Sequence, residues 1–151
     1  MKIYLNTYGG LGNQIFQIAA ALKISKASDR SKIIISTPNI EKYNVKRKLG
    51  IFDIFDSARL NIEKNSKQKL IHKIRLARVH EGKLFGKKIF LINDKNFSNC
   101  NINYENSSIY MDGYFQSDWQ QNDLDEISLI LKNSLRKNYL ENFNNNCGIH
   151  I

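Results

Sequence analysis

Residues 7–23, "TYGGLGNQIFQIAAALK", decide how the first part of the chain folds. Three of the eight glycines in the protein, Gly9, Gly10 and Gly12, fall within four residues, directly before an apolar pattern of helical period. Such a segment is either a tight turn between a strand and a helix or a loop whose backbone comes close to a bound group. In the second case the N-terminus of the helix faces that group. Glycine spacing alone leaves both interpretations open.

The residues on either side of the glycines predict a βαβ unit. "KIYLNT" (2–7) reads as a strand, and apolar side chains recur at helical spacing from Asn13 to about Ser28. "KIIIS" (32–36) is a β-branched run typical of a central parallel strand, and Pro38 ends it. We therefore expect an α/β fold with a Rossmann-like parallel sheet.

The rest of the chain continues this alternation of strands and helices. "KIFLI" (88–92) and "SIYMDGYFQS" (108–117) each begin as a strand, and the second runs into a glycine-containing loop. A helix with Asp123 as its predicted N-cap follows, and its apolar face consists of Leu124, Ile127, Leu131 and Leu135. Residues 66–80 carry a helical apolar stripe, whereas "LGIFDIF" (49–55) receives no assignment.

Length and composition exclude several classes of protein. The 151 residues, 42% of them hydrophobic, suffice for one domain with a real core. No apolar run approaches the roughly 20 residues that span a bilayer, and the alternating N-terminus is unlike a secretory signal, so a cytoplasmic location is expected. Cys100, Cys147 and the three histidines (His72, His80 and His150) lack metal-ligand spacing, so no metal is expected.

The net charge of +9 is concentrated in residues 64–88, where nine Lys and Arg residues accompany one acid, Glu81. A solvated helix face is the first interpretation of this stretch. The second is peripheral docking on the anionic inner face of the cytoplasmic membrane. Nucleic-acid binding ranks third, because only Phe85 is present for base stacking.

The glycine loop does not fit the common nucleotide-binding fingerprints. A dinucleotide fingerprint requires glycine where Ile15 stands and an acidic residue after the second strand, where Ser36 and Thr37 stand. A Walker A loop requires Gly-Lys-Ser/Thr, which is also missing. The sequence therefore disfavours NAD and ATP, and leaves open a loop that contacts some other phosphate or a sugar.

Three amide side chains follow the glycines. Asn13 has the position of an ordinary N-cap. Gln14 and Gln17 place amides in a helix that is otherwise apolar. Because buried amides require hydrogen-bond partners, these two side chains either tie down the loop or face a ligand.

The segment "GGLGNQIFQIAAALK" (9–23) resembles the N-terminal signature of the family 11 glycosyltransferases, the α-1,2-fucosyltransferases of bacteria and animals. The likeness continues in "YMDGYFQS" (110–117), which is similar to the "GYFQS" segment of that family. At "CGIHI", His150 and Ile151 match the first two positions of the family's His-x-Arg-Arg-x-Asp motif, and the arginine pair is missing. The three matches occur in family order and span nearly the whole chain.

The resemblance implies half of a GT-B enzyme, in which two Rossmann-like domains face each other across a cleft. Residues 1–146 would be the N-terminal, acceptor-side domain, and residues 147–151 the first strand of a truncated GDP-fucose-binding domain. The implied activity is inverting transfer of L-fucose from GDP-fucose to the 2-hydroxyl of a galactoside during surface-polysaccharide (O-antigen) synthesis. No metal or other cofactor is implied. The acceptor would be a galactose-terminated glycan, lipid-linked in a membrane-associated pathway.

The resemblance also implies which residues line the cleft between donor and acceptor: Gly10, Leu11, Gly12, Asn13, Gln14, Gln116, Ser117 and His150. The family's arginines hold the donor diphosphate, as bidentate contacts suit phosphate oxygens. Because this chain lacks them, we expect no transfer activity from the fragment alone.

Other interpretations remain beside this one. Tyr114, Phe115 and Trp119 form either a sugar-stacking surface or part of the core, and core packing is favoured. No catalytic base is assigned, because nothing in the sequence pairs with Asp118 or Asp123. The alternative function is a non-catalytic basic α/β module that binds nucleic acid or an anionic surface through residues 64–88.

Overall fold

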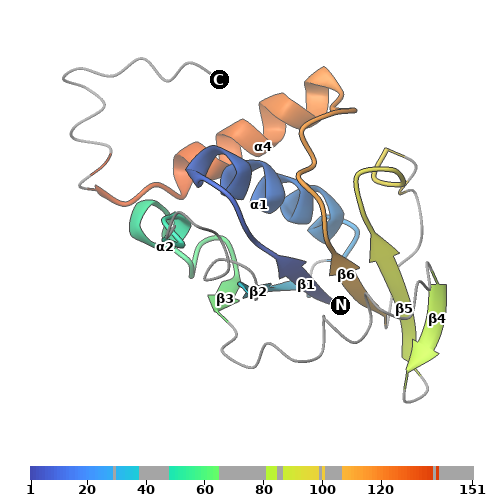
Figure 1. The fold of residues 1–151 in the computed structure, drawn as a ribbon. Helices are drawn as coiled ribbons and strands as arrows, with labels where there is room; N and C mark the ends of the chain where they lie inside the picture. The colour runs from blue at the N-terminus through green and yellow to red at the C-terminus, as the bar shows by residue number, and fades with distance from the viewer. Residues whose placement is uncertain are drawn as a thin grey trace.

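The computed structural model of the protein describes residues 1–28, 30–37, 48–64, 81–84, 87–98, 100, 107–137 and 139. The strands in them are β1 Lys2–Asn6, β2 Lys32–Ser36, β3 Ile62–Lys64, β4 Glu81–Leu84, β5 Lys87–Ile92 and β6 Ser108–Met111. They form one sheet in the spatial order β3-β2-β1-β6-β5-β4 (Figure 1). The first five strands in this order are parallel, and β4 pairs antiparallel with β5 at the edge.

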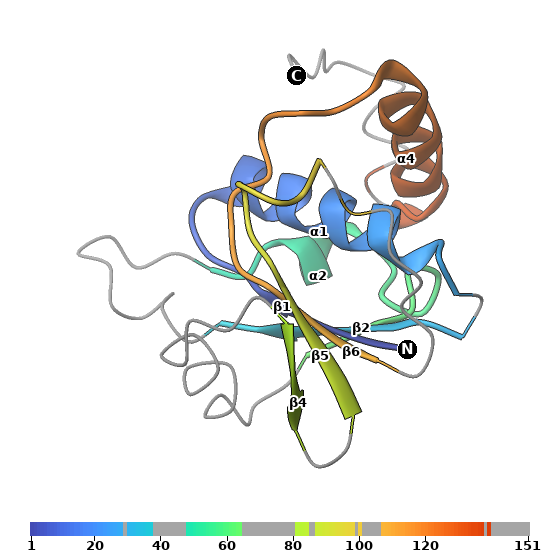
Figure 2. The ribbon, with the colours of Figure 1, turned by 90° about the vertical axis from the view of Figure 1, so that its right-hand side faces the viewer.

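The helices are α1 Leu11–Ser25, α2 Ile51–Ile54 and α4 Gln121–Asn133. Figure 2 shows α1 and α2 on one face of the sheet, with α4 packed against α1 on the side away from the strands. The expected α/β fold with a Rossmann-like parallel sheet is therefore confirmed. In the described part of the chain, no helix combines the length and the apolar character needed to cross a bilayer.

The βαβ unit predicted around the glycine loop is present. β1 and β2 are parallel neighbours, paired from Lys2 with Lys32 to Asn6 with Ser36, and α1 connects them. β2 is an interior strand of the sheet, with β1 on one side and β3 on the other, as its run of three isoleucines predicts. The sequence predicted strands at 2–7 and 32–36, and the structure has β1 at Lys2–Asn6 and β2 at Lys32–Ser36.

The core lies between α1 and the face of the sheet that α1 covers. Since side chains alternate along a strand, every second residue of each strand reaches this face. The contributing residues are all 6% exposed or less: Ile3 and Leu5 from β1, Ile33 and Ile35 from β2, Phe90 and Ile92 from β5, and Ile109 and Met111 from β6. The small residues Ala19, Ala20 and Ala21 of α1 are buried there as well, and small side chains allow the helix to approach the strands closely.

The strand order differs in one respect from the doubly wound dinucleotide fold. In that fold the fourth parallel strand along the chain lies next to the first, and the fifth lies outside it. Here the last parallel strand, β6, lies next to β1, and β5 lies outside β6. The chain therefore returns from the outer position at β5 to the centre of the sheet.

Both long helices begin before the polar residues that were predicted to cap them. The N-cap of α1 is Gly10 and that of α4 is Gln120, neither with a side-chain cap. The prediction that Asn13 and Asp123 are N-caps was wrong. Both side chains bond elsewhere: Asn13 to Gln116, and Asp123 to Lys23 of α1. A tertiary partner competes here with the local cap.

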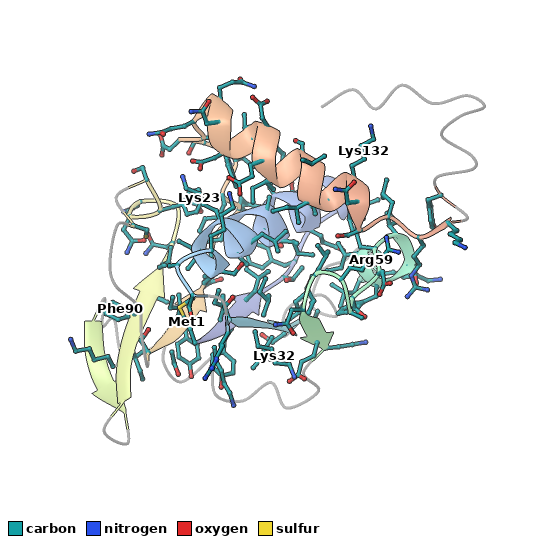
Figure 3. The ribbon with its side chains drawn as sticks, turned by 180° about the vertical axis from the view of Figure 1, so that it is seen from behind. Met1, Lys23, Lys32, Arg59, Phe90 and Lys132 are labelled. Carbon is teal, nitrogen blue, oxygen red and sulfur yellow. The ribbon has the colours of Figure 1, made fainter. Side chains whose placement is uncertain are left out.

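Lys23 joins α1 to α4 and to the segment before α4. Its Nζ atom lies 2.6 Å from Asp123 Oδ2, 5.1 Å from the ring centroid of Phe97 and 5.7 Å from that of Trp119. Figure 3 labels the residue on the side of α1 that faces α4. Lys26 and Glu126 form a second ion pair between the two helices.

Several predicted segments have a different structure or lie outside the described residues. The unassigned stretch 49–55 contains the single turn of α2, and the short strands β3 and β4 were not predicted. They have three and four residues, too few for a reliable period-2 pattern. The helical stripe at 66–80, most of the basic stretch 64–88 and the strand at 147–151 lie outside the described residues.

Candidate functional site

The candidate site lies where β1 and β6 end. These strands are parallel neighbours, paired from Lys2 with Ser108 to Leu5 with Met111, so their carboxyl ends meet at one edge of the sheet. The chain continues from β1 to β2 on one side, whereas β6 and β5 lie on the other side. The strand order thus reverses between β1 and β6, and in open α/β sheets ligands bind outside the carboxyl ends at such a point. We call residues 8–14 and 112–118, which follow the two strands, the carboxyl-edge site.

The glycine loop has one position that requires glycine. Gly9 has a φ of +84°, a left-handed conformation in which other residues are strained. A Cβ atom there would lie 2.6 Å from Nδ2 of Asn13. At Gly9, therefore, the turn explains the glycine.

Gly12 has no such structural cause. It lies in the first turn of α1, it is exposed, and a Cβ atom on it would meet nothing within 4 Å. A glycine in a helix is about 0.5–1 kcal/mol less favourable than alanine. Neither a steric contact nor a positive φ requires glycine at this position. A ligand that approaches the backbone closely would account for it.

A hydrogen bond joins the two halves of the carboxyl-edge site. Gln116 Nε2 donates to Asn13 Oδ1 at 2.8 Å, across 103 residues of sequence. Within the described part of the chain these two amide groups make no other hydrogen bond, so Asn13 Nδ2 is available as a donor and Gln116 Oε1 as an acceptor. Ser117 follows, exposed, with its Oγ atom 3.4 Å from Asp118 Oδ2.

Asp94, in the loop after β5, fixes the loop after β6. Its carboxylate accepts hydrogen bonds from the backbone N–H groups of Phe115 at 2.6 Å and Tyr114 at 3.2 Å. A Cβ atom on Gly113 would lie 2.8 Å from Asp94 Oδ2, so only glycine fits between them. Sequence reasoning missed Asp94, although its place directly after a parallel strand was a usable signal.

The aromatic residues of this loop have different roles. Phe115 is 1% exposed, has a φ of +55°, and packs with its ring centroid 5.2 Å from that of Phe97. Trp119 contacts Phe97 as well, and its Nε1–H donates to the carbonyl of Phe115 at 2.7 Å. Core packing is thus confirmed for Phe115 and Trp119. Tyr114 is 39% exposed, and its ring meets that of Tyr8 edge to face at 4.9 Å and 79°.

Gln14 and Gln17 tie down the glycine loop. Gln14 is 1% exposed, donates to the carbonyls of Gly9 and Lys48, and accepts from the N–H of Gly50. Gln17 is fully buried and its Oε1 atom accepts from the N–H of Tyr8 at 3.2 Å. Both amides therefore act as structural clamps. The Gln14 side chain, predicted to line the cleft, lies beneath the loop.

A row of polar residues crosses three strands behind this loop. Asn6, Ser36 and Asp112 stand at equivalent positions at the ends of β1, β2 and β6, and Asn6 Nδ2 donates to Asp112 Oδ1 at 2.8 Å. Asn6 and Ser36 are each 1% exposed. Among the residues that the structure describes, the Oδ1 atom of Asn6 and the Oγ atom of Ser36 have no hydrogen-bond partner. Buried polar atoms usually have one, so this end of the sheet has unused capacity for hydrogen bonds.

The charged side chains of the carboxyl-edge site are acidic. Residues 8–14 and 112–118 contain Asp112 and Asp118, and no lysine or arginine. Among the described residues, no group of three metal-binding side chains is found.

On the face of the sheet away from α1, Tyr4 and Tyr110 stack with ring centroids 4.7 Å apart. Burial, and secondarily the neighbouring Tyr4, raise the pKa of Tyr110 to about 12.

The structure brings together seven of the eight residues predicted to line the cleft. Six are at the surface of the carboxyl edge or partly exposed there: Gly10, Leu11, Gly12, Asn13, Gln116 and Ser117. Gln14 lies beside them in the first turn of α1, buried as described above. His150 lies outside the described residues.

Comparison with known proteins adds no relative. No protein-family model, curated protein or solved structure matches the chain.

Proposed function

We propose that the chain is the acceptor-side domain of an inverting α-1,2-fucosyltransferase of glycosyltransferase family 11, with GT-B architecture. The observation that supports this best is the 2.8 Å hydrogen bond between Gln116 and Asn13. It joins "GGLGNQ" to "GYFQS", the two complete segments on which the family resemblance depends. A ligand site shared by these two segments would require them to meet, as they do here.

The charges at the carboxyl edge fit the acceptor better than the donor diphosphate. Residues 8–14 and 112–118 offer amide groups and carboxylates and contain no lysine or arginine, which suits neutral hydroxyl groups. A diphosphate calls for arginine or lysine. In the proposed enzyme the arginines that follow His150 in the family would supply that charge from the second domain. We expect Arg-Arg-x-Asp to follow Ile151 in the reading frame.

The proposed reaction is a single displacement at the anomeric carbon of fucose. The 2-hydroxyl oxygen of the galactoside forms the new bond, the bond from the anomeric carbon to the GDP oxygen breaks, and the hydroxyl proton passes to a base. Asn13 and Gln116 would orient the acceptor hydroxyls, and such positioning lowers the barrier by reducing the entropy lost on reaction. GDP leaves with the negative charge.

The test measures fucose transfer from GDP-fucose to a β-galactoside by the full product of the gene. The wild-type protein is compared with the Gly12→Ala variant. Because a Cβ atom at Gly12 meets nothing, alanine should stabilise α1 by about 0.5–1 kcal/mol. The same methyl group would hinder a ligand that contacts the backbone there. We expect kcat/KM to fall at least tenfold while the melting temperature rises.

Ser128→Ala is the matched control. Ser128 is exposed on α4 and is not one of the residues of the carboxyl-edge site, and alanine there also favours the helix. It should raise stability and leave transfer unchanged. Absence of fucose transfer by the wild-type product would refute the proposal, as would a Gly12→Ala variant with full kcat/KM.

A further inference from the structure

Two of the three exposed large apolar residues in the described part of the chain belong to the carboxyl-edge site or its margin. Leu11 is 41% exposed and Tyr114 is 39% exposed, and Leu129 lies apart on α4. We propose that the Tyr114 ring is a stacking platform that binds the sugar ring of the acceptor and selects galactose over glucose. The choice of galactose rests on the proposed function.

The loop that carries Tyr114 is held rigidly although the ring is exposed. The Asp94 carboxylate accepts hydrogen bonds from the backbone N–H groups of Tyr114 and Phe115. Gly113 lies against that carboxylate, and the Phe115 side chain is buried in the core. Phe115 adopts a left-handed backbone conformation, φ +55°, which costs of the order of 1 kcal/mol. The strained residue directly follows the exposed Tyr114, and strained backbone occurs preferentially at functional sites.

Tyr8 fixes the orientation of the ring. The edge-to-face contact at 4.9 Å and 79° joins the glycine loop to the loop after β6. The Gln116–Asn13 hydrogen bond joins the same two loops. An aromatic ring and an amide pair therefore lie at one edge of the sheet, on two loops that are joined by a ring contact and by a hydrogen bond.

The amide pair complements hydroxyl groups. Asn13 Nδ2 can donate and Gln116 Oε1 can accept. A sugar hydroxyl both donates and accepts, so adjacent hydroxyls can satisfy both groups. The carboxylates of the site would repel a phosphate, which argues against a nucleotide as the occupant.

Galactose has the face that a tyrosine ring requires. Its axial 4-hydroxyl points to one side of the ring, so the hydrogens on C3, C4 and C5 form an apolar patch on the other. These C–H groups carry partial positive charge, and the face of an aromatic ring is negative. In glucose the C4 hydrogen lies on the opposite face and the patch is broken.

The experiment titrates the 151-residue chain with methyl β-D-galactopyranoside and follows saturation transfer to the ligand by NMR. We expect a millimolar dissociation constant, with the strongest transfer to the hydrogens on C3, C4 and C5. Tyr114→Ala should weaken binding at least tenfold, and Tyr114→Phe less than twofold because the ring remains. Methyl β-D-glucopyranoside should bind several-fold more weakly.

Leu129→Ala is the matched control, because it also removes an exposed apolar side chain, on α4. It should leave binding unchanged. The platform is refuted if the wild-type chain gives no saturation transfer, or if Tyr114→Ala binds as the wild type does.

The outcomes separate this inference from the proposed function. Galactoside binding that depends on Tyr114, in a gene product that transfers no fucose, would leave the platform standing and refute the transferase. Fucose transfer with a galactoside KM unchanged by Tyr114→Ala would support the transferase and refute the platform.

Discussion

Gln14 shows how much of the candidate site depends on single side chains. Its one amide group bonds backbone atoms of Gly9, Lys48 and Gly50, at 3.1, 2.9 and 3.0 Å. The sequence predicted that this amide would need partners, because it stands in an apolar helix. It could not identify Lys48 or Gly50, which are more than thirty residues away and follow no local period.

Gln14→Ala should destabilise the protein strongly. It removes three hydrogen bonds and leaves their backbone partners unsatisfied, for a loss of about 2–4 kcal/mol in the free energy of unfolding. Urea denaturation measures this. The control is Gln121→Ala, which removes one exposed hydrogen bond to Asp125 and should cost less than about 0.5 kcal/mol. Equal losses for the two variants would contradict the clamp.

At the scale of elements, periodicity predicted α1, β1, β2, β5, β6 and α4, and tertiary contacts decided where the helices begin. Asp123 was expected to cap α4, and instead it lies inside the first turn and pairs with Lys23. The side chains of this pair are 23% and 25% exposed, so water screens their attraction only in part. Helix propensity contains no information about a partner on another helix.

Lys23→Met should therefore weaken the contact between α1 and α4. It removes the ion pair and the approach of the ammonium group to two aromatic rings, for about 1–2 kcal/mol. Lys26→Met is the control, because its partner Glu126 is 58% exposed, and it should cost less than about 0.5 kcal/mol. Chemical denaturation of both variants measures the difference in the free energy of unfolding. A larger loss for Lys26→Met than for Lys23→Met would contradict the role given to Lys23 in the contact between α1 and α4.

At the scale of the whole molecule, the class of the fold could be predicted and the order of its strands could not. Glycines, β-branched runs and helical periods indicate βαβ units one at a time. The insertion of β6 between β1 and β5 depends on pairing across the entire sheet, which no local pattern records. The candidate site shares this limit: its two loops were each predicted, whereas Asp94 and the contact between Tyr8 and Tyr114 come from the assembled sheet.

The stability of the assembled sheet should depend on pH through Tyr110. The folded protein keeps this hydroxyl protonated up to about pH 12, whereas the unfolded chain releases the proton near pH 10. Between these values the unfolded state binds fewer protons, so the free energy of unfolding falls as pH rises from 10 to 12. Below pH 10 this contribution is fully present.

Tyr110→Phe should reduce this pH-dependent loss in the free energy of unfolding, by about 1 kcal/mol at pH 11. Urea denaturation at pH 8 and pH 11 measures it for both proteins, and the values at pH 8 correct for loss of the hydroxyl itself. A variant that loses as much stability as the wild type between the two pH values would contradict the expectation.

The place of β6 beside β1 also has a consequence for synthesis of the protein. Asn6 and Asp112, bonded at the ends of these strands, are 106 residues apart in the chain. A ribosome adds about 5–20 residues per second, so the finished β1–α1–β2 unit waits of the order of ten seconds before its second neighbour emerges. During that interval one side of β1 presents unpaired backbone groups, and nascent-chain chaperones would be needed most then.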